Sequence, residues 1–157
     1  MYVRFFFSLL VWLVAIPVFA DDDRRHFPTV QIPSEVVEQI NHSYRRDIKP
    51  FFQAKCFDCH VTDPDYPWYV AVPGLGAVMR KHNREGVEDL DLSNDFPFKG
   101  DGNISEVLEE IGEEVLQERE MPPTYYLVTH WDASLTDAER GRLIAWLRQT
   151  QRLLAAR

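Results

Sequence analysis

The sequence contains only two cysteines in 157 residues, which excludes the dense disulfide framework of a small secreted domain. Basic residues are also few. The 17 Lys and Arg stand against 25 Asp and Glu, and the resulting net charge of −8 disfavours charge-driven binding to nucleic acid or anionic lipid. Seven glycines and ten prolines are too few for a collagen-like or low-complexity chain. Hydrophobic residues make up 45% of the chain, which is typical of a globular protein.

Only one long apolar stretch is present, and it lies at the N-terminus. Residues 5–19 are apolar apart from Ser8, Arg4 precedes them, and Val18-Phe19-Ala20 places small residues where a signal peptidase cuts. The stretch is shorter than the roughly 20 residues that an α-helix needs to cross a bilayer. We therefore expect residues 1–20 to be a cleavable secretory signal, with an uncleaved anchor as the alternative.

Export would deliver the rest of the chain to the periplasm. Because Arg4 is the only charged residue within 1–20, cleavage would change the net charge from −8 to −9. No later apolar run is long enough to span a membrane, so we expect no stable membrane insertion of the mature chain. Residues 21–33 are polar and contain two prolines, which predicts an irregular lead-in before one domain over residues 34–157.

Two helices are predicted in the first half of this domain. Apolar residues at a spacing of three and four follow Ser34, which can cap the first helix, and Pro50 is expected to interrupt it. A short second helix is expected over Leu75–Arg84, with Gly86 stopping it. The segments on either side are rich in proline and turn residues and predict long loops.

Two capping boxes predict two further helices. Asn103 with Glu106 begins one that Met121-Pro-Pro is expected to end, and Thr136 with Glu139 begins the last. The inward face of the last helix is expected to carry Leu143, Trp146, Leu147 and Thr150. No long stretch alternates with period two, so the sequence predicts an all-α protein with long loops.

The two cysteines form the pattern Cys56-Phe-Asp-Cys59-His60. Two thiols three residues apart on one turn can each add to one vinyl group of a haem, and the histidine that follows can bind the iron as the proximal ligand. Export suits covalent haem attachment of this kind. The motif therefore predicts one haem c, covalently attached at Cys56 and Cys59, with His60 on the iron.

The cysteine pair has three other interpretations. A thioredoxin-like redox couple expects a βαβ context, which the sequence lacks. A zinc site needs further ligands, and no His-x₃₋₅-His pair is present. A structural disulfide suits an exported protein. With five histidines in the chain, one directly after the second cysteine arises by chance in only about 3% of cases, which favours the haem interpretation.

The second axial ligand of the iron has two main candidates. Met121 is the first choice because the adjacent prolines hold the backbone and can present the thioether without a flexible loop. His82 is the alternative, and an open site or another histidine remains a third possibility. Met79 lies within a predicted helix, where packing in the core is the expected role.

Aromatic side chains flank both predicted haem segments. Trp68 and Tyr69 follow the cysteine motif, and Tyr125, Tyr126 and Trp131 follow Met121. Packing against the porphyrin or the core is the simplest role for such rings. A more specific role, expected first of Trp68 or Tyr69, is a hydrogen bond from the indole N–H or phenol O–H to a haem propionate.

Taken together, these motifs resemble the exported haem-binding-domain family of c-type cytochrome-like proteins. The resemblance runs from about Ile48 to Leu147 and rests on the cysteine motif, on Pro67-Trp-Tyr69 and on Met121-Pro-Pro. It implies a cytochrome c-like single-haem fold with Met121 as the distal ligand. In such a fold, the helix from Ser34 would cross the helix from Thr136 and close the haem pocket.

Histidine and methionine together would leave no open position on the iron and would raise its potential, which suits electron transfer. We therefore expect an electron carrier rather than an enzyme. Residues 106–120 carry seven Glu and one Arg, a solvated face or a docking surface, and a redox partner protein would dock through a transient charged interface. The alternatives are a peroxidase-like enzyme with His82 as a distal base, or a haem-based sensor.

Overall fold

The computed structural model describes residues 31–156, so the expected signal segment and residues 21–30 of the lead-in lie outside the described residues. The described part is mostly helical, which confirms the all-α prediction. In chain order its elements are α1 (Ser34–Ser43), η1 (Tyr44–Ile48), α2 (Lys49–Lys55), α3 (Phe57–His60), η2 (Trp68–Ala71), α4 (Leu75–Asp89), β1 (Leu90–Asp91), β2 (Lys99–Gly100), α5 (Ile104–Gly112), η3 (Glu113–Gln117), α6 (Thr124–Leu127), η4 (Trp131–Ala133) and α7 (Asp137–Ala155). Among residues 31–156, no helix is both long and apolar enough to cross a membrane.

The first helical segment continues past the proline that was expected to interrupt it. Helix α1 passes into a π-helical turn, η1, and then directly into α2, where Pro50 lies in the first turn. A proline there is tolerated because the first N–H groups of a helix have no intrahelical partner. Ser34 is the first helical residue rather than the cap, and Pro33 occupies the capping position. Both local predictions were therefore wrong.

Two further helix ends differ from the prediction. Helix α4 runs through Gly86 to Asp89. The helix that begins at α5 and continues in the π-helical turn η3 ends at Gln117, before the prolines. Arg119 takes a left-handed φ of 59°, which no right-handed helix can accommodate. Met121 therefore lies on a non-helical segment, as expected, although the chain leaves the helix earlier than expected.

Both capping boxes are confirmed. The Asn103 side chain accepts a hydrogen bond from the backbone N–H of Ser105 at 2.9 Å, and the Glu106 carboxylate accepts one from the backbone N–H of Asn103 at 2.7 Å. The Thr136 N–H donates in the same way to Glu139 at 2.7 Å. These local bonds fix where α5 and α7 begin, and hence which faces of the two helices turn inward.

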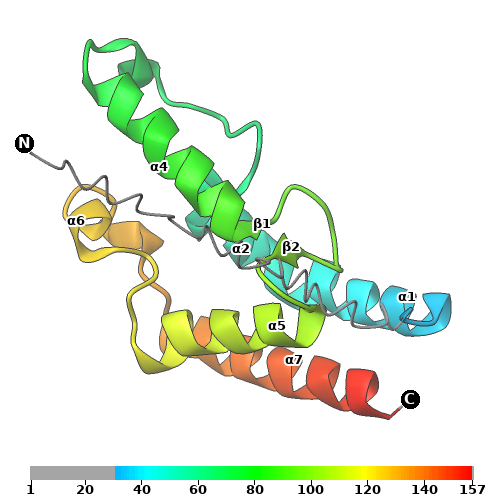
Figure 1. Ribbon diagram of the computed structural model, residues 1–157. Helices are drawn as coiled ribbons and strands as arrows, with labels where there is room; N and C mark the ends of the chain where they lie inside the picture. Colours follow the sequence, from blue (N-terminus) through cyan, green and yellow to red (C-terminus); the bar gives the residue numbers. More distant parts are fainter. Residues whose placement is uncertain (1–30, 157) are drawn as a thin grey trace, which may run out of the picture. The chain divides into compact units, whose positions relative to one another are not determined.

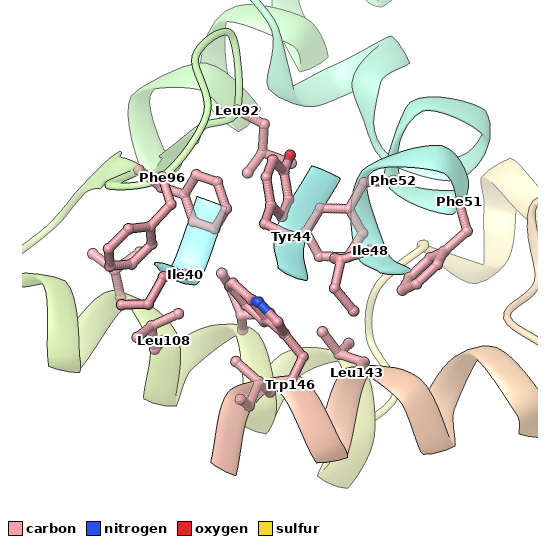
Figure 2. Packing of buried hydrophobic residues seen from close by; sticks show 14 of the residues in the cluster. Ile40, Tyr44, Ile48, Phe51, Phe52, Leu92, Phe96, Leu108, Leu143 and Trp146 are labelled. Carbon is pink, nitrogen blue, oxygen red and sulfur yellow. The ribbon is translucent and has the colours of Figure 1, made fainter. Parts of the chain in front are cut away.

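The core is an aromatic cluster held between η1 and α7. The ring of Tyr44 lies 5.8 Å from that of Trp146 and 5.1 Å from that of Phe98, measured between ring centroids. Figure 2 shows Tyr44 and Trp146 next to each other at the centre of this cluster. All four residues predicted for the inward face of α7 are buried. Helix α7 packs on α1, η1 and α5, and α5 and α7 lie alongside each other in Figure 1. The predicted packing of the first helix on the last is confirmed.

Candidate functional site

The cysteine motif forms a single helical turn, as its spacing predicts. The N–H groups of Cys59 and His60 both donate to the carbonyl of Cys56, at 3.1 and 3.0 Å. The Cys56 N–H donates in turn to the carbonyl of Phe52 in α2 at 2.8 Å. All three motif side chains are half-buried and contribute to the wall of one cavity. The turn therefore presents two thiols and an imidazole to a shared space.

A backbone carbonyl orients the imidazole of His60. Its Nδ1 lies 2.9 Å from the carbonyl oxygen of Leu90 in β1. Because a carbonyl oxygen only accepts, Nδ1 must carry the proton, and the lone pair of Nε2 is then free for a metal. The N–H of Leu92 donates back to the carbonyl of His60 at 2.7 Å, so β1 and the residue after it hold His60 at two points. This is the arrangement typical of a metal-ligating histidine.

Helix α4 packs closely against the motif. The side-chain amide of Asn83, 7% exposed, donates to the carbonyls of Val61 at 2.8 Å and Cys59 at 3.3 Å, where the short helix α3 ends. One turn later, a Cβ on Gly86 would lie only 2.6 Å from the carbonyl oxygen of Cys59. Gly86 therefore allows close approach of two helices, a role that the sequence prediction mistook for a helix stop.

The cavity beside the motif has a volume of about 450 Å³, within the range of about 300–1,000 Å³ that is common for small-molecule and cofactor sites. Its apolar wall consists of Phe52, Leu90, Leu92, Val107, Ile111, Val115 and Leu135. None of its lining residues comes from α1 or α7, so the packing of those two helices does not close the cavity, contrary to the expectation. An apolar cavity with two thiols and an oriented imidazole fits a haem.

Both candidates for the second axial ligand lie at this cavity. Met121 lines it together with Pro122 and Pro123, and His82 lines it from α4. The His82 ring centroid is 5.5 Å from that of Tyr125. Met79 does not line the cavity, and its side chain is half-buried on α4. The structure thus brings Met121 and His82 to one space and leaves the choice between them to experiment.

The two predicted propionate donors lie elsewhere. Neither Trp68 nor Tyr69 lines the cavity, and Trp68 is 83% exposed. The Tyr69 hydroxyl lies 3.1 Å from Nε2 of His130. The structure thus pairs the Tyr69 hydroxyl with His130, and the propionate contact expected of Trp68 or Tyr69 stays a prediction.

Sequence reasoning missed a contact within the site itself. The hydroxyl of Tyr126 donates to Oδ2 of Asp58 at 2.7 Å, and both residues line the cavity. Burial, followed by the bond to Asp58, raises the pKa of the Tyr126 hydroxyl well above its usual value. In the sequence, Tyr126 is one of several aromatic residues, and Asp58 is a variable position of the motif. The aromatic pair that follows Thr124, one residue after Met121-Pro-Pro, is the one available signal.

Burial also keeps the thiols protonated. It raises the pKa of Cys56 to about 12, and burial with the nearby Asp58 carboxylate raises that of Cys59. Reactive thiols of thioredoxin-like proteins have the opposite shift, because a positive environment lowers their pKa. The environment therefore disfavours a thioredoxin-like couple, and no disulfide joins Cys56 to Cys59 in the structure.

Carboxylates dominate the charged residues around the cavity. Lys55 is accompanied there by six acidic residues, namely Asp58, Glu85, Asp89, Glu110, Glu114 and Glu120. Lys55 itself is paired with Glu139 at 3.0 Å. Burial and the neighbouring Glu120 and Glu118 raise the pKa of Glu114, because its charged form is desolvated and repelled. We call these six carboxylates the acidic rim.

Comparison with known proteins identifies the family. The family model described as haem-binding domain matches residues 11–149, most of the chain. The chain belongs to the haem-binding domain family. This membership, together with the cavity, makes the protein a haem-binding protein, and the expected membership of a haem-binding-domain family is confirmed.

One curated relative adds to this. The haem-binding domain is 29% identical over 93 residues to cytochrome c peroxidase Ccp of Escherichia coli (strain K12). The matched stretch covers 59% of this chain but 20% of the peroxidase, so the chain spans about a fifth of that relative's length. No solved structure matches the chain.

The close packing of α4 on the motif generates a prediction at two glycines. Replacement of Gly86 by Ala should destabilise the haem-binding domain by on the order of 1 kcal/mol and lower its haem content, because the new Cβ meets the Cys59 carbonyl. Gly141 of α7 has open space around it, so Gly141→Ala should stabilise by about 0.5–1 kcal/mol through helix propensity. Urea unfolding and the haem-to-protein absorbance ratio measure both effects. An equal increase in the free energy of unfolding from both substitutions would contradict the packing argument.

Proposed function

We propose that this haem-binding domain is a single-haem c-type cytochrome that transfers electrons in the periplasm. The observation that carries the proposal is the orientation of His60, whose Nδ1 proton is directed to the Leu90 carbonyl beside the two thiols. A ligand set of this kind leaves Nε2 available for iron. Residues 1–20, with the features of a secretory signal, support export to a compartment where covalent haem attachment is common.

The chain's own residues would hold the haem in three ways. Each thiol, at Cys56 and Cys59, would add across one vinyl group, with the sulfur bonding one carbon and the hydrogen going to its neighbour, so no oxidant would be consumed. His60 would bind the iron through Nε2, and the apolar wall would exclude water. When bound, the haem supplies a one-electron Fe(III)/Fe(II) couple. The residues around it set its potential by ligation and by burial.

For the second axial ligand we propose Met121. It lines the cavity, and the two prolines that follow it restrict the backbone on which it is carried. A thioether is a soft ligand that favours ferrous over ferric iron, so it raises the potential and fills the last open position. A protein with both positions filled is suited to passing single electrons rather than to binding a small molecule at the iron.

A peroxidase-like or sensory function is the second candidate. The observation in its favour is that His82 lines the same cavity, where it could act as a distal base if Met121 does not bind iron. The similarity to a protein named cytochrome c peroxidase points the same way, although it spans a small part of that protein. Rapid CO binding by the reduced protein and turnover of hydrogen peroxide would favour this candidate over the electron carrier.

The partner proposed for electron transfer is a redox protein with a basic surface. The acidic rim surrounds the cavity, and its field would attract a positively charged patch toward the haem. Such contacts are small and transient and contribute more to the association rate than to affinity.

Covalent attachment is tested at the cysteines. The intact mass of the exported wild-type protein should equal residues 21–157 plus one haem. Cys56→Ser and Cys59→Ser should each leave at most one thioether and reduce holoprotein yield. The double variant should lose all its haem in acid–acetone extraction, because no thioether remains. Haem retained by the double variant would show that attachment does not occur at these residues.

The ligand proposal is tested at Met121. Met121→Ala should lose the sulfur-to-iron charge-transfer band of the oxidised protein, lower the midpoint potential and admit CO. Met79→Leu is the matched control, because Met79 lies outside the cavity and a volume-conserving swap there should cost less than about 1.5 kcal/mol. An unchanged spectrum in Met121→Ala would make His82 the leading distal candidate.

The acidic rim predicts opposite salt effects for reagents of opposite charge. Reduction by the cation hexaammineruthenium(II) should slow as ionic strength rises past about 0.1 M, where the Debye length is about 10 Å. Oxidation by the anion ferricyanide should accelerate over the same range. Glu110→Gln at the rim should weaken both trends more than Glu35→Gln on α1, which removes an equal charge away from the cavity. Salt-independent rates would remove charge steering from the proposal.

A further inference from the structure

We infer that Asp58 and Tyr126 form a clasp that positions the distal methionine, by tying the segment that carries Met121 to the turn that carries the cysteines and His60. This inference rests on the proposed role of Met121 as an iron ligand. Asp58 lies between the two cysteines of the motif, and Tyr126 lies in α6, five residues after Met121. One hydrogen bond, 2.7 Å long, therefore joins the two ligand-bearing segments.

The acceptor in this bond is a carboxylate. Hydrogen bonds to charged groups are shorter and stronger than those between neutral partners. In the part of the chain that the structure describes, no other hydrogen bond joins α6 to α3. The clasp is therefore the direct polar connection between these two walls of the cavity.

The path from the clasp to Met121 is stiff. Pro122 and Pro123 each have a fixed φ, and the N–H groups of Tyr126 and Leu127 donate to the Pro123 carbonyl at 3.0 and 3.2 Å. Few dihedral angles are consequently free to change between Tyr126 and the methionine. On the other side of Met121, the Glu120 N–H donates to the Glu114 carbonyl at 3.0 Å. The methionine is thus held between an anchor on η3 and the clasp.

Tyr126 is itself fixed by a histidine. Its ring stacks on that of His130, with centroids 4.0 Å apart and planes inclined by 4°. Nδ1 of His130 lies 2.9 Å from the Thr129 hydroxyl and 3.2 Å from the Tyr126 carbonyl, and its Nε2 lies 3.1 Å from the Tyr69 hydroxyl. Tyr69 therefore supports the clasp through its contact with His130.

A ligand held in this way depends on its support. Without the Tyr126 bond, the segment 121–126 keeps its anchor on η3 but loses its connection to α3, and Met121 can move away from the iron. The distal position would then open in a larger share of molecules. Asp58 and Tyr126 are positioning residues, since they act through Met121 and not on the iron itself.

The test is a double-mutant cycle read by spectroscopy. In Tyr126→Phe and in Asp58→Ala, the sulfur-to-iron charge-transfer band should weaken, the midpoint potential should fall and CO should bind several-fold to about 10-fold faster, in line with the loss of one hydrogen bond. The double variant should change no more than either single variant, because both remove the same interaction. Asp58→Asn, which keeps an acceptor oxygen for the Tyr126 hydroxyl, should retain most of the intensity of the charge-transfer band.

Two controls separate the clasp from simpler effects. Asp63→Asn removes an exposed carboxylate close to the motif without breaking the bond, so an equal change there would attribute the effect to charge and overturn the clasp. Tyr126→Phe keeps the ring that stacks on His130, so urea unfolding should shift little. If the wild-type protein shows the charge-transfer band and the single variants show the same band, the clasp alone is overturned. Wild-type protein without the band would overturn the Met121 proposal and the clasp with it.

Discussion

The hydrogen bond from Nδ1 of His60 to the Leu90 carbonyl is the constraint on which the rest of the site depends. It fixes the tautomer of the imidazole, so only one ring nitrogen can act as a ligand. His60 and Leu90 lie on either side of α4 in the sequence, so the bond requires α4 to fold back against the motif. Asn83 and Gly86 make that return possible, one by satisfying the carbonyls at the end of α3 and the other by the absence of a side chain.

The aromatic core and the cavity have different roles in the structure. Tyr44, Phe98 and Trp146 pack where η1, the loop after β1 and α7 meet, and none of them lines the cavity. Five residues belong to both regions, because they are buried in the core cluster and also form part of the cavity wall, namely Phe52, Leu92, Val107, Ile111 and Leu135. The rigid aromatic cluster therefore fixes α2, which leads directly into the motif, while the cavity itself remains free to accept a cofactor.

Features that depend on neighbouring residues were predictable, and features that depend on distant ones were not. The capping boxes at Asn103 and Thr136 and the single turn of the cysteine motif are local, and the structure has all three. Pro50 and Gly86 were misread because a π-helical turn and a packed neighbour, neither visible in local pattern, decide their roles. The sequence gives Met121 and His82 as candidates, but only the fold brings both to one cavity. The pairing of Tyr126 with Asp58, and that of Tyr69 with His130, joins residues that no spacing rule connects.

Residues from α2, α3, α4, α5, η3, α6 and the loop after η4 line the cavity. These segments are spread over most of the described chain. A group bonded at α3 and held at the Met121 segment would act on the polypeptide as a cross-link does. It would remove conformations from the unfolded chain and oppose separation of the two walls, and the stabilisation from such a link grows with the length of chain that it encloses. Cofactor binding and folding would then be coupled, and the polypeptide would reach its full stability only as the holoprotein.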